Sequence, residues 1–291
     1  MPKSDPTLNS FLEKYAETQV ACTPYALTRM GVDRTRTVLK IEDYMILCAP
    51  MQLSFNKIIL LASLSRDELV FFQRFKGALA ALSMEFNLPS RRDPLKLFIR
   101  VGIDGFAQMK GRENAGMVVL TLKNTPEDLV LIMGSYLEHM ERLTAQYEAS
   151  QQSIANITPE TSKLMGYNQY AVLTDATGSR RIKVFRLSVK EMEHLEGPAA
   201  PALVKGSSVQ YQLFFQRYRM TIAGTICEAS RLPTGMLRTK ADLSFSPELV
   251  EILDDYWFQE RARQRKAQVQ AQSMALDDPN AAIPGASPIS D

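Results

Sequence analysis

Four cationic side chains crowd one short segment that follows a glycine turn: Arg180, Arg181, Lys183 and Arg186. A guanidinium presents paired donors that match phosphate oxygens and guanine edges, and it also stacks on bases. The segment therefore has the chemistry to bind an anionic nucleotide. The alternative, which the pattern favours somewhat, is a strand at the edge or rim of a sheet that its charges keep soluble.

Residues suited to catalysis or metal binding are few. The two histidines, His139 and His194, lie among polar neighbours, and we expect both to be solvent-exposed rather than catalytic. Neither a GxxxxGKS/T nor a GxGxxG motif occurs, and the three cysteines show no CxxC spacing. The sequence therefore predicts no enzymatic activity, no metal site and no bound cofactor.

The elements of the first half alternate between strands and helices. Strand patterns cover residues 37–41, 44–48, 53–61, 79–86, 96–103 and 117–122. Between them, Ser65-Arg66-Asp67-Glu68 reads as a capping box that opens a helix. Thr125-Pro126-Glu127 then begins an amphipathic helix of about 24 residues, or about 36 Å. Polar and small residues at 148–157 indicate a domain boundary.

The second half contains mainly strand patterns, at residues 170–173, 181–187, 209–215, 220–228 and 237–245. Short strands at this spacing favour a closed antiparallel barrel. Ser246-Pro247-Glu248 caps a final helix, whose apolar face consists of Leu249, Ile252, Leu253, Tyr256 and Trp257. The fold class is therefore α+β and mainly β.

Residues 259–291 lack such an apolar face. A basic run at 261–266 either docks on phosphate or an acidic partner, or simply complements the negative end of the helix dipole, which we favour. The last 15 residues have too little apolar surface to order themselves. We therefore expect a basic helical extension followed by a disordered tail.

Length and charge narrow the class of protein. A chain of 291 residues suits two domains, and a net charge of +2 creates no field that would attract nucleic acid. The N-terminal segment has no apolar signal region, and the apolar runs are far shorter than the roughly 18–20 residues that span a bilayer. We expect a cytoplasmic protein with no membrane insertion and no nucleic-acid partner.

The order of elements in the second half resembles the PilZ domain, a six-stranded β-barrel family that serves as a receptor for cyclic di-GMP. The resemblance lies in the strand that ends at Arg186-Leu187-Ser188, the strand 222–226, the strand that ends at Leu243-Ser244-Phe245 and the closing helix 246–258. The first half resembles the N-terminal domain that precedes PilZ in some bacterial proteins, notably of spirochaetes, at residues 44–52, 65–75 and 125–134. The resemblance implies an N-terminal PilZ-associated domain (1–150), a PilZ-like barrel (151–258) and an extension with its tail (259–291).

The ligand motifs of that family are degenerate here. An RxxxR pair is expected near residues 146–154, where the chain has QYEASQQSI. The D/NxSxxG turn aligns with residues 186–191, where only Ser188 matches, because Arg186 replaces the acid and Glu191 replaces the glycine. The arginine pair would supply bidentate contacts to a dianion, and glycine permits a backbone conformation that glutamate resists.

The resemblance and its lost motifs lead to a non-enzymatic regulatory or adaptor protein. It would act through contacts with a protein partner, in bacterial second-messenger or motility signalling. The alternative is a cyclic di-GMP receptor with an altered site, for which the candidate ligand-binding residues are Arg180, Arg181, Arg186 and Ser188.

Overall fold

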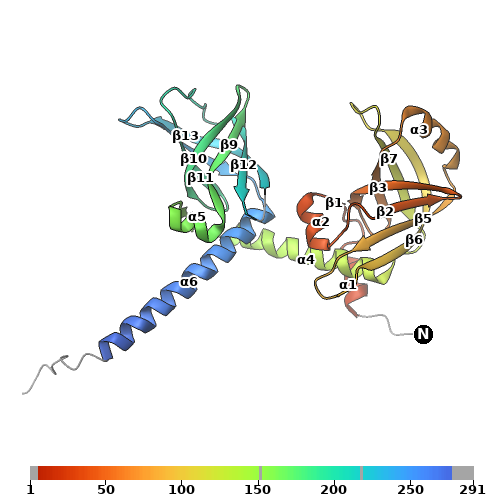
Figure 1. Ribbon diagram of the computed structural model, residues 1–291, viewed down its shortest axis with the longest axis horizontal. Coiled ribbons are helices and arrows are strands. Elements are labelled where there is room, and N and C mark those ends of the chain that lie inside the picture. Colours follow the sequence, from red (N-terminus) through yellow and green to blue (C-terminus); the bar gives the residue numbers. More distant parts are fainter. Residues whose placement is uncertain (1–5, 151–152, 217–218, 277–291) are drawn as a thin grey trace, which may run out of the picture. The chain divides into compact units, whose positions relative to one another are not determined.

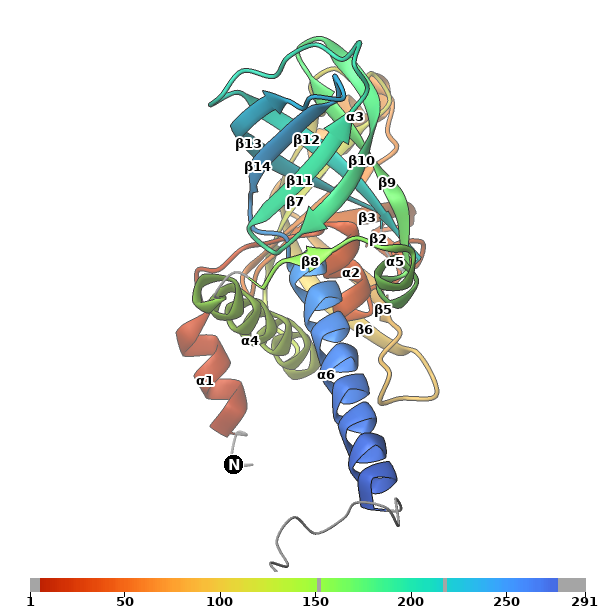
Figure 2. The same ribbon diagram turned by 90° about the vertical axis from the view of Figure 1, so that its left-hand side faces the viewer.

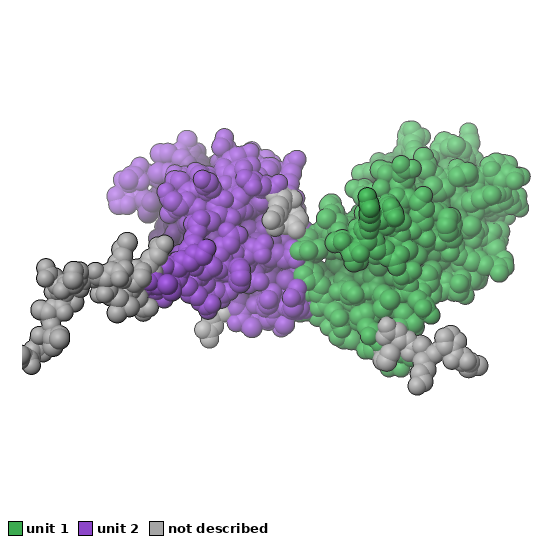
Figure 3. Space-filling model, turned by 60° about the horizontal axis from the view of Figure 1, so that its bottom comes forward, with its two compact units in different colours: residues 1–141 green, residues 142–291 purple. Residues whose placement is uncertain are grey.

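The computed structural model describes residues 6–150, 153–216 and 219–276. The chain divides into two compact units, residues 1–141 and 142–291, which Figure 3 shows in green and purple. Helix α4 contributes residues to both units. The tail expected beyond the basic helix, residues 277–291, lies outside the described residues.

Each unit consists mainly of strands (Figure 1). The first contains α1 (Pro6–Lys14), β1 (Val20–Ala21), α2 (Pro24–Met30), β2 (Thr37–Ile41), β3 (Tyr44–Leu53), β4 (Lys57–Ala62), α3 (Arg66–Phe72), a 3-10 turn η1 (Gln73–Phe75), β5 (Leu79–Phe86), β6 (Leu95–Gln108), β7 (Gly116–Leu122) and most of α4 (Glu127–Ala149). The second contains β8 (Ala155–Asn156), α5 (Pro159–Met165), β9 (Tyr167–Asp175), β10 (Gly178–Leu187), β11 (Glu191–Glu196), β12 (Ser208–Phe215), β13 (Arg219–Arg231), β14 (Leu237–Leu243) and α6 (Pro247–Leu276).

The first unit is a closed antiparallel barrel. Its strands follow the order β3-β2-β5-β6-β7-β4, and pairing of β3 with β4 closes the ring. The short β1 pairs with the last residues of β3. Side chains alternate along each strand, so that Leu39, Leu60, Leu82 and Ile99 are almost fully buried in an apolar interior. The sequence predicted these strands but left open whether they form a barrel.

Helices close this barrel at both ends. Figure 1 shows α3 at the end opposite to α1 and α4. The capping box that starts α3 is present, because the Ser65 hydroxyl accepts from the Glu68 amide at 3.3 Å and the Glu68 carboxylate accepts from the Ser65 amide at 2.7 Å. Helix α1 lies directly on α4, where a Cβ at Gly134 would meet the Phe11 ring at 2.2 Å. Only glycine allows this close approach.

The second unit is also a closed antiparallel barrel of six strands. The order is β11-β14-β13-β12-β9-β10, pairing of β10 with β11 closes the ring, and the short β8 extends β10. The predicted strands correspond to β9, β10, β12, β13 and β14. Strand β11 was not predicted from the sequence, although it closes the barrel.

Helix α6 leaves one end of the second barrel (Figure 2). Its first turns bury Leu249, Leu253 and Tyr256 against the barrel core, as the predicted apolar face requires. The helix does not end at Phe258 but continues through the basic run to Leu276. The predicted fold class is confirmed: α+β and mainly β, with an antiparallel six-stranded barrel followed by a C-terminal helix.

Candidate functional site

The turn between β10 and β11 occupies the position of the expected ligand motif. Ser188 is buried, with 2% of its surface exposed. Its hydroxyl oxygen accepts from the amides of Lys190 at 3.2 Å and Glu191 at 2.8 Å, and the Ser188 amide donates to the Glu191 carbonyl at 2.8 Å. Ser188, the one residue that matches the motif, therefore stabilises the turn, because its hydroxyl oxygen accepts hydrogen bonds from backbone amides of the turn itself.

A pocket of about 320 Å³ lies beside this turn, and we call it the motif pocket. The two segments expected to carry the ligand motifs meet there, together with the start of α6. Its lining residues are Gln146, Ala149, Ser150, Ser153, Ser188, Val189, Lys190, Val250, Leu253, Asp254 and Trp257. The motif pocket is thus bounded by the two segments with which the degenerate motifs were aligned, and α6 forms a further wall.

The charges of the motif pocket nearly cancel. Among its lining residues, Lys190 is the only cation and Asp254 the only carboxylate. The Lys190 ammonium donates to the Glu148 carbonyl at 3.1 Å and lies 5.4 Å from the centre of the Tyr147 ring. The pocket therefore offers one point charge with partners of its own, and no planar guanidinium.

Arg180 points into the second barrel. It continues the inward-facing series of Ile182 and Val184, and its guanidinium pairs with Asp175 at 2.6 Å and with Glu196. Burial alone would raise the pKa of Asp175, but hydrogen bonds from Thr177 and Arg180 lower it to about 2. Arg180 is thus neutralised by two carboxylates.

The other candidate arginines lie on the outside of the same barrel. A bulge between Val184 and Arg186 shifts the register of β10, so that Arg186 is no longer on the face of Val184 as its spacing suggested. The Arg186 guanidinium donates to Glu193 at 3.0 Å.

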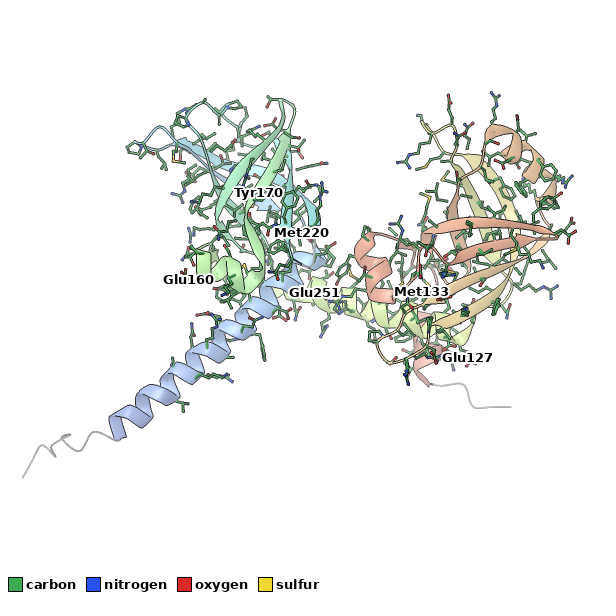
Figure 4. The ribbon with its side chains drawn as sticks, viewed as in Figure 1. Glu127, Met133, Glu160, Tyr170, Met220 and Glu251 are labelled. Carbon is green, nitrogen blue, oxygen red and sulfur yellow. The ribbon has the colours of Figure 1, made fainter. Side chains whose placement is uncertain are left out.

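Arg181 stacks on the Tyr170 ring with its guanidinium carbon 3.9 Å from the ring centre, and Figure 4 labels Tyr170 on β9. Of the four candidates, only Ser188 lines the motif pocket, so the structure does not bring them together.

The interior near Arg180 is polar, which the sequence did not reveal. His194 was expected to be solvent-exposed, but it is fully buried on β11 because it faces inward between Met192 and Glu196. Its Nε2 lies 3.2 Å from the Tyr211 hydroxyl, and its Nδ1 lies 3.7 Å from Glu196. Burial, and then the charge of Arg180, lowers the pKa of His194 to about 3, so the ring is neutral near pH 7.

This cluster has unsatisfied atoms. Arg180 Nη2, His194 Nδ1 and Glu196 Oε1 have no hydrogen-bond partner in the described part of the chain. A buried polar atom is stable only when a partner replaces its water, so this cluster depends on the pairing of Arg180 with its carboxylates.

The remaining sequence candidates are accounted for by local contacts. His139 was also expected to be exposed, but it is half-buried in the first unit, where its Nε2 lies 3.0 Å from the Tyr25 hydroxyl.

Within the described residues, no group of three or more His, Cys, Asp or Glu side chains is arranged to hold a metal ion. None of the helices in residues 6–150, 153–216 and 219–276 is long and apolar enough to cross a membrane.

The family of the first unit follows from a direct match. Residues 6–140 match the family described as the PilZN3 domain. This match places the first unit in that family and confirms the predicted N-terminal PilZ-associated domain.

Several solved structures are similar over most of their length. PlzA of Borreliella burgdorferi in complex with c-di-GMP is 12% identical, with 86% of this chain and 97% of that chain covered and a TM-score of 0.43. YcgR of Escherichia coli in complex with c-di-GMP is 11% identical, with coverage of 86% and 91% and a TM-score of 0.29. MotI of Bacillus subtilis, an inhibitor of motility, is 10% identical, with coverage of 80% and 99% and a TM-score of 0.30. No curated protein matches the chain.

Proposed function

We propose that this chain is a PilZ-family regulatory protein that acts by binding other proteins and has lost the usual mode of cyclic di-GMP binding. In this proposal it is a cytoplasmic adaptor in bacterial second-messenger or motility signalling and performs no catalysis. One observation carries the proposal: the motif pocket is lined by one lysine, one aspartate and no arginine. A ligand with two phosphates needs bidentate, charge-assisted contacts, which such a pocket does not supply.

Calorimetric titration of the full chain with cyclic di-GMP tests this directly. We expect no heat of binding at ligand concentrations up to the millimolar range. Thermal unfolding in the same ligand should show no shift, because a ligand stabilises only a native state that it binds. Micromolar or tighter binding by the wild-type chain would overturn the proposal.

A gain-of-function variant shows whether the missing side chains are the reason. Gln146 and Ser150 are four residues apart and both line the motif pocket, so changing both to arginine recreates the RxxxR spacing on its wall. Arg186→Asp and Glu191→Gly restore the turn in the same protein. We expect this variant to bind cyclic di-GMP at micromolar concentrations.

The matched control carries the same two turn substitutions with Gln146→Ala and Ser150→Ala, and it should not bind cyclic di-GMP. Thermal melting of both variants checks that the barrel still folds. A correctly folded arginine variant that fails to bind would contradict the role given to the missing arginines.

The alternative, a receptor with an altered site, has one observation in its favour. Arg181 is the candidate arginine whose guanidinium carries no carboxylate partner among the described residues and lies over an aromatic ring instead. If the wild-type chain binds cyclic di-GMP and Arg181→Ala abolishes the binding, this alternative replaces the proposal.

A further inference from the structure

The outer face of the first barrel exposes large apolar side chains. Phe98, Met45 and Leu47 are 76%, 72% and 71% exposed, although they lie in the middle of regular strands. Together with Val38, Leu79 and Ala81 they face outward from the neighbouring strands β3, β2, β5 and β6. We call these six residues the apolar face. Contiguous exposure of this kind marks interaction surfaces in natural proteins.

The register of the strands places these side chains in two parallel rows. One row runs Leu47, Val38, Ser83, Phe98 across the four strands, and the next runs Met45, Lys40, Ala81, Arg100. With strands about 4.8 Å apart, each row is about 14 Å long. An apolar row thus lies directly beside a row that contains two cations.

Two cations on the face lack an acidic partner among the residues that the structure describes. Lys40 and Arg100 are exposed, and neither forms an ion pair within the described residues. The neighbouring Lys96 differs, because its ammonium lies 3.6 Å from Glu85 on the same face. The apolar face therefore presents two uncompensated positive charges, with two strand spacings, or about 10 Å, between them.

These dimensions fit one amphipathic helix. A helix is about 10 Å wide, and residues i and i+7 on the same side are about 10.5 Å apart along its axis. A helix laid along the apolar row would place its apolar stripe on Leu47, Val38 and Phe98. Two acidic residues at i and i+7 on its flank would then reach Lys40 and Arg100.

A second copy of this chain fits the face less well. A two-fold contact would set the same patch against itself and bring the cations of one copy near those of the other.

A membrane also fits the face less well. Glu42 and Asp43 form the tip of the β2–β3 hairpin and are exposed, so a flat anionic surface would meet two carboxylates there. A helix only 10 Å wide lies across the strands without reaching that tip.

We propose that the apolar face of the PilZN3 domain is a docking surface for an acidic amphipathic helix of a partner protein. This rests on the proposed function, in which the chain acts through protein contacts, and it locates one such contact.

A pair of designed peptides tests the proposal on the full chain. Both are labelled helical peptides of 18 residues with one leucine stripe, and they differ only in carrying glutamates or lysines on the flanks of the stripe. Fluorescence anisotropy should give at least tenfold tighter binding of the glutamate peptide. Raising the salt concentration should reduce that preference, since screening weakens exposed charge pairs.

Three variants make the test specific. Phe98→Ser should weaken binding of the glutamate peptide at least tenfold, whereas Val70→Ser removes an equally exposed apolar side chain outside the face and should change nothing. The double variant Lys40→Glu/Arg100→Glu should reverse the preference in favour of the lysine peptide. A structural effect of the substitutions would not reverse it.

Four outcomes overturn the proposal: equal binding of both peptides, no binding of either, no effect of Phe98→Ser, or no reversal by the double variant. Sedimentation that shows dimers lost in Phe98→Ser would assign the face to a second copy. Phe98-dependent binding to vesicles of phosphatidylglycerol would assign it to a membrane. The cyclic di-GMP titration reports on the other barrel, so failure of the docking surface and failure of the proposed function are separate results.

Discussion

The two barrels of this chain share their strand number and closure, yet their interiors are built differently. The first is filled by apolar side chains such as Leu39, Leu60 and Ile99. The second has an apolar core beside α6, but it also buries Arg180, His194 and Glu196 as one charged and polar cluster. One architecture is thus compatible with an interior held by packing alone and with one that also needs correct charge pairing.

The comparison teaches where each barrel is vulnerable. Apolar burial depends little on pH and loses stability gradually when side chains shrink. A buried ion pair adds little net stability, but removing one partner leaves a charge without water or a counterion. We therefore expect charge-changing conditions to unfold the second barrel before the first.

The largest effect is expected for Arg180→Leu. It leaves the Glu196 carboxylate, only 2% exposed, without its main partner, and should lower the free energy of unfolding of the second barrel by about 3–5 kcal/mol. Trp257 is the only tryptophan in the chain and packs against that core, so its fluorescence during urea unfolding reports this barrel.

Two further variants bracket this result. Arg181→Leu removes the neighbouring exposed arginine and should cost less than about 1 kcal/mol. Arg180→Leu/Glu196→Leu removes the more deeply buried carboxylate together with its cation and should recover most of the loss, because the remaining Asp175 keeps its hydrogen bonds from Thr177. A loss below 1 kcal/mol for Arg180→Leu alone would show that the two interiors do not differ in the way described.

A smaller effect is expected from mild acid. Because the folded-state pKa of His194 lies near 3 and an unfolded histidine titrates near 6.5, the unfolded chain takes up a proton first as the pH falls. The stability from neutral His194 is complete above about pH 6.5 and is lost as the pH falls toward 3. We expect a loss of about 2 kcal/mol in the Trp257 transition between pH 6.5 and 5.

His194→Gln cannot titrate and should flatten this pH dependence, whereas His139→Gln in the first unit should leave it unchanged. If the slope of the Trp257 transition is the same in wild type and His194→Gln, the buried histidine is not its cause.

The smallest effect should be equal in the two barrels. Ser65 caps α3 in the first, and Thr158 caps α5 in the second by accepting from the Thr161 amide at 3.2 Å. Changing either to alanine should cost about 1 kcal/mol in the unfolding transition of its own barrel. A much larger cost at Thr158 would mean that the second barrel is fragile throughout, rather than at its charged cluster.

The polar interior also explains the main failure of prediction from sequence. Strands such as β5 and β7 show apolar residues at every second position, and they were predicted to within a few residues. In β11 the inward positions are Met192, His194 and Glu196, so the segment reads as polar and was not predicted as a strand. Alternation reveals a strand only when the side that it buries is apolar.

Pairing between distant strands was also beyond the sequence. The first barrel needs β2 to pair with β5 and β4 with β7, and the second needs β9 to pair with β12 and β11 with β14. The register between the consecutive strands β10 and β11 also slips at a bulge. No local pattern marks that bulge, which decides on which side of β10 Arg186 lies. The motif pocket itself was not predicted, although the segments aligned with the two degenerate motifs contribute to its lining.

The extent of α6 has a consequence for what stabilises it. It continues for 18 residues beyond Phe258 as far as Leu276, or about 27 Å at 1.5 Å per residue, and its side chains at 259–269 are mostly exposed. Because few of the side chains at 259–269 are packed, this stretch depends on the intrinsic helix preference of its Glu, Arg, Gln and Ala residues. Its order is therefore set by the local sequence, whereas the first turns of α6 are held by the barrel core.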